Sequence, residues 1–300
     1  MTSSTAHRSA RPVSPPGFGA PGAAGIAVLA MLTVQVGAAA SVPMFERIGA
    51  AGTAWLRLCW AGLFFVALVR PRLRALPREG VRRAVLLGVV SAAMTLSFFA
   101  AIERIPLGVA VALEFLGPLG VAVAHRVGRL GLVWPGLAAV GLLGLTEPWN
   151  GTTDLVGVGL ALVAALGWAA YIVITQRVGD TLAGLQGLAI SMPAAALAAT
   201  IVGAPAAIPR LTGEVILLSA GLALLLPVIP YALELVALRR LTAAAFGTLA
   251  SLEPALAVLI GLLLLHQRPA PWQFAGVVLV VIAGIGAQRH GDRPAAPSVP

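Results

Sequence analysis

The sequence predicts an all-helical integral membrane protein, and its composition and the length of its apolar runs lead to this class. Of 300 residues, 59% are hydrophobic and only 10% are charged, whereas about a quarter of the residues of a globular domain are charged. The mean hydropathy is +0.96. Apolar runs long enough to cross a bilayer as helices, about 17–25 residues, recur along the chain. The sequence does not contain the short alternating strands that form a membrane barrel.

Ten such runs are predicted to be spans, joined by short connections. They are 22–42, 53–70, 82–102, 107–125, 130–147, 155–175, 183–203, 215–236, 243–265 and 271–288. Residues 1–21, rich in Ser, Pro and Ala, are predicted to be a disordered tail, and 289–300 form a second tail. The AAAS at 38–41 also fits a signal-peptide cleavage site, but the length of 22–42 favours a span.

The basic residues are all arginine, and their positions predict the orientation of the spans. If the amino terminus is cytoplasmic, fifteen arginines fall on inside segments and four on outside segments, with Arg57 inside a span. This positive-inside bias predicts that both termini are cytoplasmic. The formal net charge of +9 could suggest nucleic acid, but no basic surface interleaved with aromatic residues is present. Nucleic-acid binding is therefore not expected.

An internal repeat appears when residues 100–124 are shifted by 136 positions onto 236–260. Five identities result, and the shift carries the fourth span onto the ninth. The matched pairs are Ala101/Ala237, Arg104/Arg240, Leu113/Leu249, Leu116/Leu252 and Pro118/Pro254. Because a repeat of five spans enters the membrane from opposite sides in its two copies, the pattern predicts two inverted five-helix halves, 22–147 and 155–288. Many secondary transporters share this architecture.

Four ionisable residues lie inside predicted spans: Arg57, Glu114, Glu234 and Glu253. A charge at the middle of a membrane helix costs about 2.5–3.5 kcal/mol on insertion scales, so such residues normally face a cavity or a partner. Arg57 and Glu234 also fit a structural role near an interface, where a long side chain reaches toward water. Glu114 and Glu253 lie deeper in their runs, which favours a cavity.

Prolines accompany both deep acids. Glu114 precedes Pro118 by four residues, so the two share a helix face, and the missing proline N–H leaves the Glu114 carbonyl without its helical partner. In the second half, Glu253 directly precedes Pro254. The repeat brings both acids near one central axis, so we predict that they line a polar cavity at mid-membrane, where a carboxyl group can exchange a proton or bind an ammonium group.

A third wall of the predicted cavity comes from PVIPYALEL in the eighth span. Pro230 loosens the helix there, and Tyr231 shares a face with Glu234. Trp168 and Tyr171, from GWAAYIVITQR, are further candidates to line the cavity. Prolines also kink membrane helices for packing alone, and aromatic packing explains the tryptophan and tyrosine equally well.

Motifs of other classes are not found. The sequence has no phosphate-binding glycine loop, nucleophile elbow or His-Glu metal motif. Its single cysteine, Cys59, allows neither a disulfide framework nor a thiolate metal site. We therefore expect no cofactor and no metal, and transport driven by an ion gradient or by the gradient of the substrate.

Four stretches together resemble one family. They are LRLCWAGLFFVALVRPRL (56–73), IPLGVAVALEFLGPLGVAVA (105–124), GWAAYIVITQRVG (167–179) and PYALELVALRRLTAAAFGTLASLEPALAVLIG (230–261). They resemble the threonine/homoserine exporters of the EamA branch of the drug/metabolite transporter superfamily, over about residues 25–288. The resemblance implies ten spans in two inverted halves and export of small amino acids or related metabolites, in antiport with protons. Many members carry a Gly-Glu pair after the ninth span, where this chain has His266 and Gln267.

The leading hypothesis is a secondary transporter of the bacterial inner membrane that exports threonine- or homoserine-like amino acids by alternating access. Glu114 and Glu253 would bind the substrate ammonium group or a proton, and Arg57 would attract the substrate carboxylate. Transport of another metabolite, in either direction, and an intramembrane enzyme acting on a lipid are the alternatives. The oligomeric state is open, and a homodimer is one of the states that the pattern allows.

Overall fold

The computed structural model describes residues 20–72, 75–124, 133–147, 154–238, 241 and 243–289. Within these ranges every regular element is a helix, which confirms the all-helical prediction. The elements are α1 (Ala20–Val69), α2 (Arg78–Ile102), α3 (Leu107–Glu114), α4 (Leu116–Ala124), α5 (Val133–Thr146), α6 (Leu155–Gly179), α7 (Gln186–Ala207), η4 (Ile208–Arg210), α8 (Gly213–Ala223), η5 (Leu224–Val228), α9 (Ile229–Leu238), α10 (Ala243–Ala250), α11 (Glu253–Leu264) and α12 (Pro271–Arg289). The tails 1–19 and 290–300, and Arg126, Arg129, Arg239 and Arg240, lie outside the described residues.

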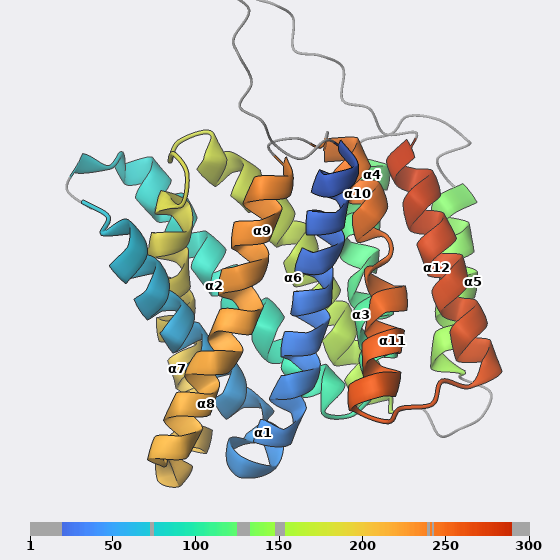
Figure 1. The fold of residues 1–300 in the computed structure, drawn as a ribbon, viewed down its shortest axis with the longest axis horizontal. Helices are drawn as coiled ribbons and strands as arrows, with labels where there is room; N and C mark the ends of the chain where they lie inside the picture. The colour runs from blue at the N-terminus through green and yellow to red at the C-terminus, as the bar shows by residue number, and fades with distance from the viewer. Residues whose placement is uncertain are drawn as a thin grey trace, which may run out of the picture.

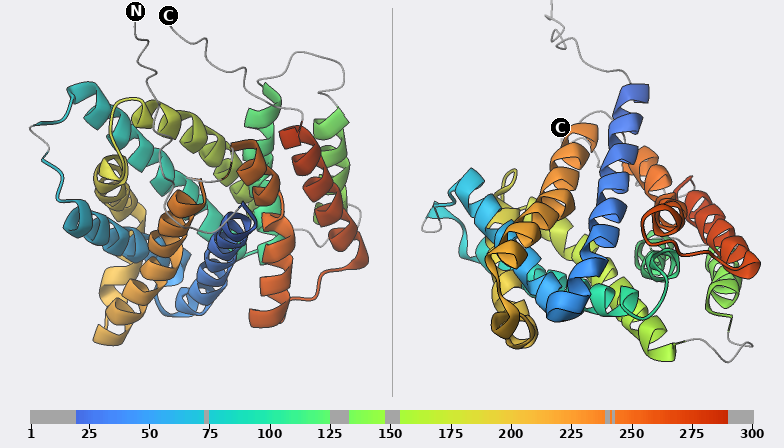
Figure 2. Two further views of the ribbon diagram at one scale, coloured as in Figure 1. Left: turned by 45° about the horizontal axis from the view of Figure 1, so that its top comes forward. Right: turned by 60° about the horizontal axis from the view of Figure 1, so that its bottom comes forward.

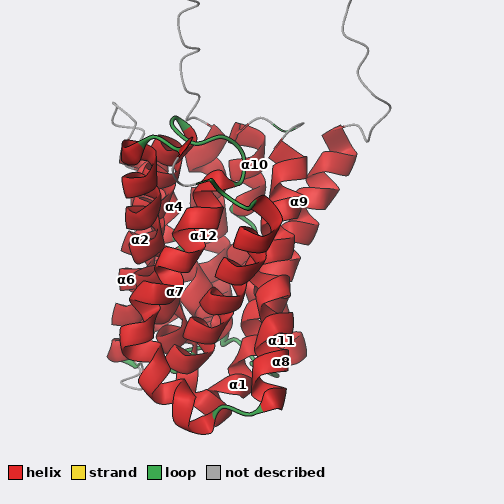
Figure 3. Cartoon of the chain, turned by 90° about the vertical axis from the view of Figure 1, so that its left-hand side faces the viewer, coloured by secondary structure: helices red, strands yellow, loops and turns green. Residues whose placement is uncertain are grey.

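The helices form a bundle whose connections gather mainly at its two ends (Figures 1 and 3). One end holds the start of α1, the end of α12 and the turn between α6 and α7 (Figure 1). We call it the terminal end. The opposite, far end holds Gly49 and the turn between α2 and α3.

Helix α1 differs from the sequence prediction, which placed two spans at 22–42 and 53–70. Helical structure instead runs from Ala20 to Val69 and bends once, at Gly49 (φ 74°, ψ 161°). Glycine is suited to this positive φ because it has no Cβ to clash with the backbone. The bend turns α1 into two arms, and the predicted connection is reduced to a single residue.

Two predicted spans are each broken into two helices. The predicted span 107–125 is divided at Phe115 into α3 and α4, and the predicted span 243–265 is divided at Ser251 and Leu252 into α10 and α11. A shift of 136 positions carries the end of α3, Glu114, onto the end of α10, Ala250. The first parts, α3 and α10, are both eight residues long. The two breaks therefore coincide under the shift that aligned the sequences.

Close packing joins segments that are distant in the sequence. Helix α1 packs on α7, α2 packs on α6 and α7, and α3 packs on α11. Helices α5 and α12 lie side by side at one edge of the bundle (Figures 1 and 2). Gly108 of α3 lies so close to Val258 of α11 that a Cβ on Gly108 would come within 2.3 Å of the valine Cγ2. Glycine at this position thus permits the contact between α3 and α11.

The outer surface of the bundle is apolar along its sides. Large side chains such as Leu166 (74% exposed) and Ile201 (82% exposed) point away from the core, where a soluble protein would keep polar residues. Six helices in the described residues are long and apolar enough to cross a membrane, and α5, α12 and the segment 107–121 are shorter apolar helices. This apolar surface is suited to contact with the hydrocarbon chains of lipids.

Candidate functional site

A cavity of about 580 Å³ lies inside the bundle. Its walls come from both arms of α1 and from α2, α3, α4, α6, α7, η5, α9, α10 and α11. At the terminal end it reaches the turn between α6 and α7, where Leu182, Gly184 and Leu185 line it. The cavity therefore runs from the middle of the bundle toward one membrane face.

Nine of the ten site residues expected from the sequence line this one cavity. They are Arg57, Glu114, Pro118, Trp168, Tyr171, Pro230, Tyr231, Glu234 and Glu253. The tenth, Pro254, is buried at the start of α11 and is not part of the cavity wall. Residues from five separate predicted spans thus share one space, and their roles in it remain predictions.

Arg57 is the cation of the cavity. It lies on the second arm of α1, is only 5% exposed, and places its Cζ 4.2 Å from the centre of the Phe99 ring. Its Nε and Nη1 atoms have no hydrogen-bond partner, and none of the ion pairs among the described residues includes it. The aromatic face stabilises the guanidinium group by a cation–π contact, but its hydrogen-bonding capacity stays unused.

Three carboxyl groups face the same space. Glu114 is the last residue of α3, Glu253 is the first residue of α11, and Glu234 lies in α9. None of them takes part in an ion pair among the described residues. Because two of these acids flank the helix breaks, the same interruption that divides each span also exposes a carboxyl group to the cavity.

Aromatic side chains surround these charges. The hydroxyl groups of Tyr171 and Tyr231 lie 3.0 Å apart and share a hydrogen bond across the cavity between α6 and α9. Trp168 meets Phe115 edge to face, with ring centres 6.3 Å apart. Rigid apolar walls of this kind exclude water, so charges inside interact more strongly than at the surface.

Gln35 is a polar residue of the cavity wall that the sequence did not indicate. Gln35, on the first arm of α1, is 1% exposed and lines the cavity, and its Oε1 has no hydrogen-bond partner. The predicted cavity residues were ionisable, aromatic or proline residues, and an uncharged amide was not among them. The available signal was a single uncharged amide inside the apolar run AVLAMLTVQVGAAASV.

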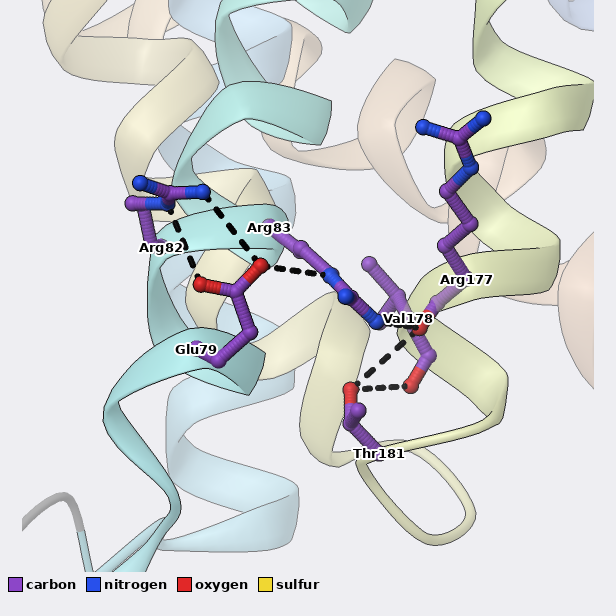
Figure 4. A network of polar contacts seen from close by, with 6 residues as sticks. All are labelled: Glu79, Arg82, Arg83, Arg177, Val178 and Thr181. Carbon is purple, nitrogen blue, oxygen red and sulfur yellow. Dashed lines mark hydrogen bonds and ion pairs between the residues drawn. The ribbon is translucent and has the colours of Figure 1, made fainter.

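Polar contacts hold the rim of the cavity at the terminal end (Figure 4). Glu79, in the first turn of α2, pairs with Arg83 at 2.9 Å, and Arg83 Nη1 donates to the carbonyl of Arg177 in the last turn of α6. Thr181 Oγ1 donates to the carbonyls of Arg177 and Val178. The start of α2 is thus tied to the end of α6, next to Val178 and Gly179 of the cavity wall.

The far end is closed by α3 and α11. Besides the contact of Gly108 with Val258, the backbone N–H of Leu107 donates to Gln267 Oε1 at 3.0 Å. This N–H belongs to the first turn of α3, where helical partners are missing. Gln267 therefore caps a helix from 160 residues away.

Comparisons with known proteins agree with this geometry. Residues 155–286 match the model of the EamA-like transporter family. The threonine/homoserine exporter RhtA of Escherichia coli K12 is 36% identical over 265 residues, which cover 87% of this chain and 90% of that protein. RhtA of Salmonella typhimurium LT2 is 34% identical over the same length. A crystal structure of a further protein aligns over 91% of this chain and 99% of its own, with a TM-score of 0.58 and 17% identity, a likeness of fold alone.

The relatives cover nearly the whole chain, at an identity that shows common family membership. They carry solutes across membranes, so this chain is a multi-pass membrane transporter and not an enzyme. The chain belongs to the EamA-like transporters, in the family of the threonine/homoserine exporter RhtA.

Proposed function

We propose that the protein exports threonine- or homoserine-like amino acids across the cytoplasmic membrane, in exchange for protons and by alternating access. The observation that carries the proposal is the buried, unpaired guanidinium group of Arg57 in one cavity with three unpaired carboxyl groups. The names of the relatives support the choice of substrate.

The charges of the cavity complement an α-amino acid. A buried charge without a partner is unfavourable by several kcal/mol, so a site that keeps Arg57 unpaired is suited to an anionic ligand group. The substrate carboxylate would bind Arg57, and its ammonium group would bind Glu114 or Glu253. A zwitterion thereby satisfies both kinds of charge at once, whereas an apolar solute satisfies neither.

The two broken spans support alternating access. Their coinciding breaks are the expected consequence of two inverted five-helix halves, in which discontinuous helices meet at mid-membrane. In the proposed ten-span count, each arm of α1 is one span, and α3–α4, α8–α9 and α10–α11 are one span each. Rocking of the halves would open the far end as it closes the terminal end.

The arginine distribution supports a cytoplasmic location of the terminal end. Arg78, Arg82, Arg83 and Arg177 all belong to this end, and arginines collect on cytoplasmic segments. The cavity would then be open to the cytoplasm, the state that loads a substrate for export. Both termini would also be cytoplasmic.

Proton coupling is assigned to the carboxyl groups. A carboxyl group can either carry a proton or, as a carboxylate, bind an ammonium group, so Glu114 can do each in a different state of the cycle. Competition between proton and substrate for one carboxylate is sufficient for antiport.

The test is counterflow into proteoliposomes. The purified protein is reconstituted, the vesicles are loaded with unlabelled threonine, and uptake of labelled threonine and homoserine is followed with and without a pH gradient. Saturable exchange that responds to the gradient supports the proposal. No exchange by protein shown to be folded would reject the substrate class, and exchange indifferent to the gradient would reject the proton coupling.

A further inference from the structure

Two residues of the cavity wall have buried polar atoms without a hydrogen-bond partner: Arg57 and Gln35. The proposed function uses Arg57 and leaves Gln35 without a role. Gln35 is 1% exposed and sits on the first arm of α1, next to helix neighbours that are tightly packed. A Cβ on Gly37, for example, would lie 2.8 Å from the Leu226 side chain. The backbone of this part of α1 is therefore packed closely against η5.

An unsatisfied buried amide oxygen needs an explanation, because a buried acceptor without a partner is unfavourable. No described residue donates a hydrogen bond to Gln35 Oε1. Ser91 Oγ donates to the carbonyl of Leu87, and the hydroxyl groups of Tyr171 and Tyr231 bind each other. The Oε1 acceptor of Gln35 is thus free to bind a group of a ligand.

The chemistry of the other groups narrows what that ligand group is. A carboxylate would bind the guanidinium group of Arg57, and an ammonium group would bind a carboxylate more strongly than a neutral amide. What remains for Gln35 is a neutral group. A hydroxyl group both donates and accepts, so it can pair with the carboxamide through either of its ends.

We infer that Gln35 binds the side-chain hydroxyl group of the substrate and makes the site selective for hydroxy amino acids. The inference rests on the proposed function and goes beyond it, since Arg57 and the acids would bind any α-amino acid. A substrate of the same shape that lacks the hydroxyl group leaves the Gln35 oxygen unpaired. Sites that hydrogen-bond a substrate hydroxyl group discriminate strongly against such analogues.

Two pairs of amino acids isolate the hydroxyl group. Valine has the shape of threonine with a methyl group in place of the hydroxyl group, and norvaline relates to homoserine in the same way. In the counterflow assay we expect the wild-type protein to prefer threonine over valine, and homoserine over norvaline, by about tenfold or more, as one buried hydrogen bond predicts.

Gln35→Met tests the residue itself, because methionine has a similar length and no amide. We expect both preferences to fall to near one, through weaker transport of the hydroxy amino acids and unchanged or better transport of the apolar ones. Gln35→Glu keeps an acceptor and should keep a preference for the hydroxyl group. Thr33→Val is the matched control: it removes a hydroxyl group that donates to the carbonyl of Ala30 from the same arm of α1, and should leave both ratios unchanged.

The outcomes separate the inference from the function on which it rests. If the wild type exchanges threonine and valine equally, or if Gln35→Met keeps the wild-type ratios, the inference is wrong and the exporter stands. If the wild type exchanges none of the four amino acids, the proposed function fails first. Should Gln35→Met not fold, retention of the preference by Gln35→Glu and by Thr33→Val, with its loss in Gln35→Leu, supports the same conclusion.

Discussion

Among the described residues, ion pairs form at the ends of the bundle and none forms in the middle. At the ends, Arg104 pairs with Asp154 at 2.9 Å and Arg47 pairs with Glu214 at 2.7 Å. In the middle, Arg57 has no ion-pair partner, although three carboxyl groups line the same cavity. The chain thus forms ion pairs where water already solvates the charges, and leaves a charge unpaired where this is most unfavourable.

The difference indicates that the ion pairs at the ends have a structural role and that the unpaired charge in the middle has a functional one. Exposed ion pairs contribute about 1 kcal/mol or less, so the pairs at the ends only fix the helix ends relative to one another. A buried unpaired charge lowers the stability of the protein, and a site that retains one must gain something from it elsewhere. In the proposed function, binding of a charged substrate supplies that gain.

The largest expected effect comes from Arg57→Gln. It removes the cation from the cavity, and loss of one partner of a buried charge pair weakens binding by about 2–5 kcal/mol, at least about thirtyfold. Threonine counterflow should fall to background, while the melting temperature in detergent should stay or rise. The matched control is Arg47→Gln, which breaks an exposed pair and should leave counterflow intact. Normal counterflow in Arg57→Gln would show that transport does not need the Arg57 charge. The contrast between paired ends and unpaired cavity would then say nothing about function.

The second effect concerns coupling as well as binding, because Glu114 is proposed both to exchange a proton and to bind the ammonium group. Glu114→Gln retains a polar side chain of the same size but cannot exchange a proton. Stimulation of threonine flux by a pH gradient should be lost, and insertion and folding should be unaffected. Glu214→Gln, at the far end, should keep the stimulation. Gradient-driven flux of wild-type size in Glu114→Gln would assign coupling to another carboxyl group of the cavity.

The sequence was sufficient for the positions of the helices, because hydropathy reports the free energy of inserting each run by itself. Each predicted run contains a helix, but the breaks between α3 and α4, between α10 and α11, and in η5 were not predicted. The predicted connection 43–52 contains the bend at Gly49, but the rest of it is helical although it includes Pro43, Glu46 and Arg47.

The cavity was predictable only in part. Ionisable residues inside apolar runs marked Arg57 and the three glutamates, and the repeat placed Glu114 near Glu253. The contact of Arg57 with Phe99 joins α1 to α2, and the cap of α3 by Gln267 joins α3 to the segment that follows α11. Such contacts depend on the tertiary arrangement, so no local sequence pattern predicts them.

A smaller effect is expected at the closed far end. In Gly108→Ala the new Cβ would lie 2.3 Å from Val258 Cγ2 and 3.1 Å from its Cα, so α3 and α11 must separate. Overpacking of this kind costs about 1–3 kcal/mol, and the melting temperature should fall. Gly120→Ala is the matched control in α4, where a Cβ meets nothing within 4 Å, and should be neutral or stabilising. Equal melting temperatures of the two variants would show that the far end is loosely packed.

The smallest effect is expected at an exposed pair. The backbone N–H of Gly157 donates to Asp154 at the start of α6 and, together with Arg104, lowers the pKa of Asp154 below its ordinary value of 3.8. A lowered pKa means that the charge stabilises the fold above pH 3.8 and that this contribution is lost as the pH falls through the lowered pKa. Asp154→Asn should therefore melt slightly below the wild type at pH 7, and the gap should close in acid. Because both partners are partly exposed (45% for Arg104 and 33% for Asp154), the gap should also shrink in high salt. A gap that stays constant from pH 7 to pH 3 would mean that the carboxylate contributes through its shape as a helix cap and not through its charge.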